Sequence, residues 1–199
     1  MLKAALRWHD PNTPAVFELP KKPPPKERYL TRDEYDTLLS NAETPHIKLF
    51  IVLALATAAR TSALLELTWD RVDFDRKLIT LSTGDDAENK RRAIVPMTER
   101  ARKELEKAYQ ARETEFVVEY AGRPVKAVIK AFKRTCQKVG LNDVSPHVLR
   151  HTAAVWMAEA GVSMSEIAQY LGHTSTAVTE RVYARYSPAY LRSAASALE

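Results

Sequence analysis

The stretch "SPHVLRHTAAVWMAEAGVSMSEIAQYLGHTSTAVTERVYARYS" spans residues 145–187 and predicts three successive helices. The Ser-Pro pair at 145–146 is typical of a helix start, and Gly161 predicts the end of that first helix. The sequence Ser-Met-Ser-Glu at 163–166 is a capping box that begins a shorter helix, which Gly172 ends. The stretch therefore predicts a helical unit that carries histidine, arginine and tyrosine side chains.

One interpretation of these side chains is a metal site. His147 and His151 lie four residues apart, which is the spacing that two zinc ligands on one helix require. In the metalloprotease pattern a glutamate follows the first histidine, but Val148 stands there. Because Cys136 is the only cysteine, no cysteine-built zinc site can form. Zinc binding is the least favoured interpretation of the stretch.

A second interpretation is a helix-turn-helix that binds DNA without catalysis. The segment "SEIAQYLGHTSTAVTERVYA" contains the short helix, the glycine turn and the following helix of such proteins. This interpretation gives no role to His147 and Arg150.

The third interpretation is phosphoryl transfer. His147 and Arg150 share a face at a helix N-terminus, where backbone N–H groups and the helix dipole favour an anion. The planar guanidinium of Arg150 suits two phosphate oxygens. His173 follows the glycine turn and can donate to the same anion, and the phenol of Tyr183 can act as a nucleophile once its proton is removed. The combination favours this interpretation, although each residue alone is more often structural.

Composition sets broader limits. The 199 residues, 45% hydrophobic and 28% charged, suit one soluble globular domain with a real core. No apolar run reaches the ~18–20 residues that a membrane span needs, and the single cysteine predicts a reducing compartment. The net charge of +5 permits nucleic-acid binding but does not by itself indicate it.

The chain divides into two parts by composition. Residues 1–28 are proline-rich and are expected to form an extended linker, with the first ten residues a remnant of a preceding DNA-gripping domain. Residues 29–199 are expected to form the folded domain, beginning with a capping box at 31–34. Helical periodicity dominates this part, and alternating apolar residues between 72 and 96 predict a small antiparallel sheet. The expected fold class is therefore α+β, mostly helical with a sheet of about three strands.

A one-sided basic face is predicted on the helix "VKAVIKAFKRTCQKVG", residues 125–140. It carries four basic residues at intervals of four, with no acidic residue among them: Lys126, Lys130, Arg134 and Lys138. Such a face is usually only solvated, but one-sided positive charge is also what duplex DNA attracts.

Five separated motifs resemble the tyrosine recombinases of the phage integrase family. "HVLRH", "YLGH" and "TERVYARY" stand in the order and approximate spacing of that family. Upstream, "ATAARTSALLELTWDRVDF" is similar to the block that carries the family's first arginine, here Arg60, and "NKRRAIVPM" to the hairpin that carries its catalytic lysine, here Lys90. The resemblance covers about residues 30–190 and implies the tyrosine recombinase catalytic fold.

The resemblance also implies how a DNA phosphate is cleaved. Arg60 and Arg150 would bind the non-bridging oxygens of the scissile phosphate, with His173 as a third donor, and so stabilise charge in the transition state. Tyr183 would attack phosphorus and leave a 3′-phosphotyrosine with a free 5′-hydroxyl. The reaction conserves bond energy, and the resemblance therefore implies neither a cofactor nor a metal ion.

Two further residues would move protons. Lys90 would protonate the departing 5′ oxygen, and His147 would act as the acid–base partner near the tyrosine. Arg91 and Arg92 are rivals for the place of Lys90, although arginine is a poor acid. Ala63 departs from the family, which often has an acidic residue there to brace the site.

Three other side chains near these motifs are not expected to be catalytic. His151 is expected to be structural, packed beside Arg150. Tyr186 and Tyr190 are rival nucleophiles, but the family places its tyrosine nine or ten residues after the Leu-Gly-His histidine, which favours Tyr183.

The expected function is that of a site-specific DNA recombinase or integrase catalytic domain. The expected partners are double-stranded DNA and, in the full-length protein, further subunits in a synaptic tetramer, with no membrane partner. The expected location is the bacterial cytoplasm, associated with the nucleoid. The alternatives are DNA relaxation of the type IB topoisomerase kind and a non-enzymatic helix-turn-helix regulator.

Overall fold

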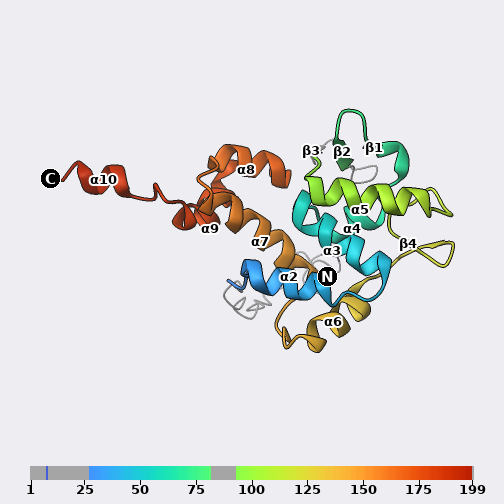
Figure 1. Cartoon of the computed structure of the whole chain (residues 1–199). Coiled ribbons are helices and arrows are strands. Elements are labelled where there is room, and N and C mark those ends of the chain that lie inside the picture. Colours follow the sequence, from blue (N-terminus) through green and yellow to red (C-terminus); the bar gives the residue numbers. More distant parts are fainter. Residues whose placement is uncertain (1–7, 9–26, 82–92, 199) are drawn as a thin grey trace.

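The computed structural model of the protein describes residues 8, 27–81 and 93–198 (Figure 1). Most of the predicted linker, residues 1–28, lies outside the described residues. The elements of the folded body are, in chain order, α2 (Arg32–Ser40), α3 (Pro45–Thr57), α4 (Thr61–Leu65), η1 (Trp69–Arg71), β1 (Val72–Asp73), β2 (Leu78–Leu81), β3 (Ala93–Pro96), α5 (Glu99–Gln110), β4 (Glu119–Tyr120), β5 (Arg123–Pro124), α6 (Ile129–Lys138), α7 (Pro146–Glu159), α8 (Met164–Leu171), α9 (Thr176–Tyr183), η2 (Ala184–Tyr186) and α10 (Arg192–Ser196).

Helix α3 forms the centre of the fold. Its sequence PHIKLFIVLALAT is apolar on nearly every side, and most of its residues are buried. The helix packs against α5 and α7, and Figure 1 shows it enclosed among α2, α5 and α7. Phe50 of α3 meets Phe132 of α6 edge to face, with ring centroids 6.3 Å apart, and so joins α6 to the same core. A helix this apolar is stable only when other elements cover it.

The predicted antiparallel sheet is confirmed. Its strand order is β1-β2-β3, and Ile79 of β2 pairs with Val95 of β3. Both of these side chains are buried, as the alternation of apolar residues predicts for a strand with one covered face. A separate two-stranded hairpin, β4 with β5, was not predicted as a sheet. The polar loop between β2 and β3 lies outside the described residues, and Lys90 with it.

Most predicted helix ends are also confirmed. The capping box of α2 is present in both directions, between Thr31 and Glu34. The Ser163 hydroxyl accepts from the backbone N–H of Glu166 at the start of α8, and Gly172 ends that helix in the left-handed conformation with φ 65°. Ser145 occupies the N-cap of α7 but makes no side-chain capping bond. The fold class, mostly helical with a small antiparallel sheet, is confirmed.

One predicted helix is shorter than expected. The helix predicted over residues 125–140 begins only at Ile129. The reason is that the preceding hairpin continues past β5, since the backbone N–H of Val125 donates to the Val118 carbonyl at 3.1 Å. Lys126 therefore lies before α6 and not on it, so the four basic residues do not share a single helix.

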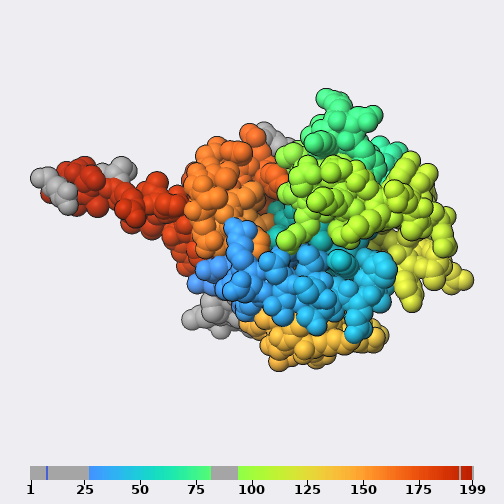
Figure 2. Space-filling view, viewed as in Figure 1, coloured from blue at the N-terminus to red at the C-terminus, as the bar shows by residue number. Residues whose placement is uncertain are grey.

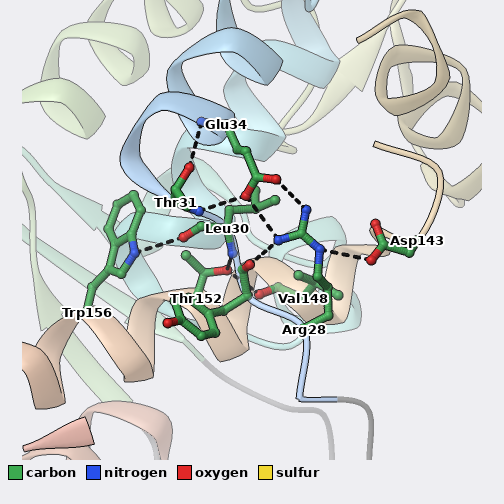
Figure 3. Close-up of polar contacts among 9 residues, drawn as sticks. Arg28, Leu30, Thr31, Glu34, Asp143, Val148, Thr152 and Trp156 are labelled. Carbon is green, nitrogen blue, oxygen red and sulfur yellow. Dashed lines mark hydrogen bonds and ion pairs between the residues drawn. The ribbon is translucent and has the colours of Figure 1, made fainter. Parts of the chain in front are cut away.

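The start of the folded domain is fixed against α7 (Figure 3). Arg28 donates to both carboxylate oxygens of Glu34, over 3.0 and 2.6 Å. Leu30 is buried; its N–H donates to the Thr152 hydroxyl at 2.9 Å, and its carbonyl accepts from the Trp156 indole at 3.0 Å. The two hydrogen bonds of Leu30 thus fix the start of the folded domain against α7. The opposite end of the chain, beyond η2, extends away from the body towards α10 (Figures 1 and 2).

Candidate active site

Arg150 joins three segments that are distant in sequence. Its side chain is only 6% exposed. One guanidinium nitrogen donates to the Ala58 carbonyl at 2.6 Å, and the other donates to the Leu171 carbonyl at 2.8 Å. The second nitrogen also lies 3.1 Å from Nε2 of His173. Burial, followed by the positive charge of Arg60, lowers the pKa of Arg150 to about 10.

Arg60 enters the same site from the end of α3. Ala58, which ends α3, adopts a left-handed conformation with φ 49°, a region that costs a residue with a side chain about 1–2 kcal/mol. This turn directs the Ala58 carbonyl to Arg150 and makes Arg60 the exposed N-cap residue of α4. Burial is the main cause of the lowered pKa of His147, Arg150 and His173, and the charge of Arg60 lowers each pKa further. Like charges held together in this way favour an anionic ligand.

His173 follows Gly172 and is oriented from both sides. Because an arginine N–H can only donate, Nε2 of His173 accepts from Arg150. Nδ1 therefore carries the proton and donates to the hydroxyl of Thr179, which lies 2.9 Å away. Thr179 is fully buried. Burial, together with the charges of Arg150 and Arg60, lowers the pKa of His173. In this state His173 is neutral, and it can donate to a phosphate from Nε2 only after gaining a proton there.

Tyr183 ends α9 and is 8% exposed. Its hydroxyl lies 3.2 Å from Nδ1 of His151. Burial raises the pKa of Tyr183, and the charge of Arg150 lowers it in part. The rival Tyr186 is placed differently, because its hydroxyl accepts from Arg185 and its ring packs on another tyrosine.

The structure brings five of the six predicted catalytic residues into one region. Each of the five either shares a hydrogen bond with another or affects the pKa of another through its charge: Arg60, His147, Arg150, His173 and Tyr183. The side chain of His147 reaches solvent at the first turn of α7, where partial desolvation and the two arginines lower its pKa. The sixth residue, the lysine of the β2–β3 loop, lies outside the described residues, as do its two arginine rivals.

His151 has a contact that sequence reasoning missed. It was expected to pack structurally beside Arg150, yet its ring faces the Tyr183 hydroxyl. Burial is the main cause of its lowered pKa. The available signal was spacing, because His147 and His151 lie one helical turn apart on the same face of α7.

The predicted basic face is only partly free of acidic residues. Lys126, Lys130 and Arg134 are exposed. Lys138, at the end of α6, forms an ion pair with Glu43 from the loop before α3. The interpretation from the sequence considered only residues of the helix itself and so missed this carboxylate from another element.

The described ranges contain no group of three or more histidine, cysteine, aspartate or glutamate side chains that could hold a metal ion. Among the same residues no helix is both long and apolar enough to cross a membrane.

Comparison with known proteins decides the family. The model of the phage integrase family matches residues 28–189. The chain belongs to this family. It is 30% identical over 183 residues to the tyrosine recombinase XerA of Pyrococcus horikoshii, which covers 88% of this chain and 62% of that protein. The chain thus spans less than two thirds of this relative's length.

Two solved structures have the same fold as this phage integrase family member. A crystal structure of XerA recombinase has a TM-score of 0.71 at 25% identity and covers 91% of this chain and 67% of that one. The Tn1549 transposon integrase in complex with circular intermediate DNA has a TM-score of 0.75 at 22% identity, covering 100% and 77% of the two chains. The tyrosine recombinase catalytic fold predicted from the motifs is confirmed.

Proposed function

We propose that this chain is the catalytic domain of a site-specific DNA recombinase, which cleaves and rejoins strands through a 3′-phosphotyrosine. The observation that carries the proposal is the buried Tyr183 hydroxyl beside a site with two arginines, one of which is fixed by two backbone carbonyls. A phenol at this position can attack a phosphate that the arginines bind, and positive charge there stabilises the transition state.

The proposed roles follow the charges of the site. Arg60 and Arg150 bind the non-bridging oxygens, which relieves the repulsion between their two positive charges. His173 adds a donor once it is protonated, and the anion itself favours that protonation. Lys90 protonates the leaving 5′ oxygen, and His147 contributes acid–base chemistry beside the phosphate.

The proposed substrate is double-stranded DNA, and the location is the bacterial cytoplasm at the nucleoid. Support for the substrate comes from the DNA bound in the related Tn1549 structure and from the exposed basic residues around α6, which are suited to phosphate contacts. Ion pairing with Glu43 reduces the contribution of Lys138. Assembly of four subunits on paired sites is part of the same proposal. Residues 1–28 would then connect the catalytic domain to a preceding DNA-gripping domain.

The two alternative functions are less favoured. A simple helix-turn-helix regulator does not require a guanidinium that ties α7 to the ends of α3 and α8. A type IB topoisomerase would share the chemistry, but the relatives are named recombinases. Exchange of strands between two cleaved duplexes, as opposed to relaxation of supercoils alone, distinguishes a recombinase from a topoisomerase.

The direct test is covalent trapping. The chain is incubated with a pool of nicked duplexes of randomised sequence, in which a cleaved strand loses its end and cannot be rejoined. A protein–DNA band that survives denaturant is expected, and sequencing of the trapped DNA gives the preferred site. Tyr183→Phe removes only the nucleophilic oxygen, so the band should disappear while duplex binding stays nearly unchanged. Tyr186→Phe is the matched control and should keep the band; the opposite pattern would contradict the proposal.

A further inference from the structure

We propose that His151 is the general base of this site and takes the proton of the Tyr183 hydroxyl as that oxygen attacks the DNA phosphate. The inference rests on the proposed function, because it names the proton acceptor for that reaction. It assigns a catalytic task to a residue that the family resemblance leaves without one.

Geometry is the first support. Nδ1 of His151 lies 3.2 Å from the Tyr183 hydroxyl, and the ring centroids are 5.2 Å apart with a tilt of 40°. This is the long end of the hydrogen-bond range, as is common for catalytic contacts before substrate binds. Within the part of the chain that the structure describes, His151 is the hydrogen-bond partner of this hydroxyl.

The direction of the hydrogen bond follows from the state of each group. Burial raises the pKa of Tyr183, so near neutral pH the phenol keeps its proton and can donate it. Burial lowers the pKa of His151 below its ordinary value, so the imidazole is neutral and Nδ1 can accept. The proton of the neutral ring then resides on Nε2, which is buried and has no hydrogen-bond partner among the described residues.

The surrounding charges oppose a permanently protonated His151. His147, one turn earlier on α7, and Arg185, on η2, both lower its pKa. The charge of Glu27 raises the pKa of His151, and Glu27 pairs with Arg185 at 2.9 Å, so this carboxylate partly offsets the charge of Arg185 and favours the imidazolium that forms during the reaction. His151 can therefore accept a proton transiently and return it.

His147 has a different setting. Its side chain is more exposed, and the charges that lower its pKa are the two phosphate-binding arginines, Arg150 and Arg60. These neighbours place it with the anion, whereas His151 contacts the nucleophile. On this face of α7, His147 thus lies near the phosphate-binding arginines and His151 contacts the phenol.

The proposed step balances as follows. The phenolic oxygen of Tyr183 forms a bond to phosphorus while the bond from phosphorus to the 5′ oxygen breaks. The phenol proton moves to Nδ1 of His151, and the leaving 5′ oxygen takes a separate proton from Lys90. In the rejoining step the 5′-hydroxyl attacks, Lys90 recovers its proton, and His151 returns a proton to the released phenol.

The kinetic test compares the wild-type chain with His151→Asn, and uses His147→Asn as the matched control. The asparagine side chain places a hydrogen-bonding atom near the position of Nδ1 but has no basic nitrogen. Single-turnover formation of the covalent adduct is measured on a nicked duplex between about pH 5 and pH 9. Melting temperature and duplex affinity are measured alongside and should not change in His151→Asn.

The wild-type rate should fall as the pH drops through the lowered pKa of His151, below the ordinary value of ~6.5, and stay level above it. His151→Asn should cleave about 10²–10⁴-fold more slowly near neutral pH. Its rate should rise roughly tenfold per pH unit, because only phenol that has already ionised can attack. His147→Asn should keep the shape of the wild-type profile.

Three outcomes would overturn the assignment. They are a wild-type rate in His151→Asn, a slower rate with an unchanged pH profile, and the appearance of the rising profile in His147→Asn instead. A general loss of structure would appear in the melting temperature, and His151→Gln then provides a second variant without a base.

A second measurement does not depend on activity and separates failure of this inference from failure of the proposed function. Nitrogen-15 spectra of labelled histidine in the whole chain report the tautomer, with the His151 signals assigned by their loss in His151→Asn. We expect a neutral ring with the proton on Nε2 near pH 7 and a shift of the Nδ1 signal in Tyr183→Phe. A proton on Nδ1, or an Nδ1 signal that ignores Tyr183→Phe, refutes the inference even if the wild-type chain cleaves DNA; absence of any adduct instead refutes the proposed function.

Discussion

The two sides of the site are held in opposite ways. On the α7–α9 side, Arg150 is buried and bonded to backbone carbonyls, and His173 and Tyr183 each have a hydrogen-bond partner. On the other side, Arg60 is exposed at the start of α4. The first side is organised by the protein alone.

This difference shows how tasks are divided within the site. A preorganised donor costs no reorganisation when charge develops in the transition state, which is the basis of strong electrostatic catalysis. An exposed arginine has rotational freedom that it loses only on binding phosphate. The α7–α9 side is therefore expected to determine stability and chemistry together, and the Arg60 side to determine chemistry alone.

Of the substitutions that follow, Lys90→Ala is expected to have the largest effect. Lys90→Ala should slow cleavage by about 10²–10⁴-fold through loss of the general acid. A substrate with sulfur in place of the bridging 5′ oxygen should restore most of the rate, because its thiolate leaves without a proton. Rates of adduct formation on both substrates provide the measurement. If sulfur rescues Arg92→Ala and not Lys90→Ala, Arg92 and not Lys90 occupies the place of the general acid.

The two arginines give the next prediction. Arg60→Ala and Arg150→Ala should each slow cleavage by about 10²–10³-fold, the usual effect of losing one donor to developing charge. The two variants should differ in thermal stability. Arg150→Ala leaves the Ala58 and Leu171 carbonyls without their donor. The free energy of unfolding should therefore fall by about 2 kcal/mol, once the relief of charge repulsion is included, which lowers the melting temperature by roughly 4–8 °C.

Arg60→Ala removes an exposed charge that repels Arg150, so its melting temperature should equal or slightly exceed that of the wild type. Thermal denaturation of both variants beside the adduct assay checks the pair. Equal destabilisation by the two substitutions would show that the contrast between the two sides is wrong.

The smallest expected effect concerns the left-handed turn at Ala58. Ala58→Gly removes a backbone cost of about 1–2 kcal/mol but adds flexibility to the unfolded chain. A net gain of about 0.5–1 kcal/mol, or roughly 1–4 °C in melting temperature, is expected with cleavage retained. Ala59→Gly is the matched control, since Ala59 does not have a positive φ, and it should lower the melting temperature.

Much of this architecture was predictable because its signals are local. Capping residues such as Thr31 with Glu34, and the left-handed Gly172, fix helix ends within a few residues of sequence. The apolar alternation in β2 and β3 sufficed for the sheet. The helix predicted from residue 125 was too long because a backbone bond from Val125 to the preceding hairpin overrides its helical periodicity.

The motifs predicted which candidate residues lie near one another, but not the contacts that they make. Family motifs brought Arg150, His173 and Tyr183 together, but they did not indicate that Ala58 and Leu171 would supply the carbonyls that hold Arg150. The contact between His151 and Tyr183 joins residues 32 positions apart and depends on how α9 packs on α7. Such contacts between elements leave no periodic trace in the sequence.

The bonds of Arg150 have a consequence for how such a gene decays. Because one guanidinium joins the ends of α3 and α8 and is also proposed to bind the phosphate, mutations at Arg150 should lower the stability of the fold as well as the activity. A mutation of Arg60, or Tyr183→Phe, should leave a folded, DNA-binding and inert chain. A copy released from selection for recombination, but kept for occupying DNA, should therefore lose Arg60 or the nucleophile first and retain Arg150.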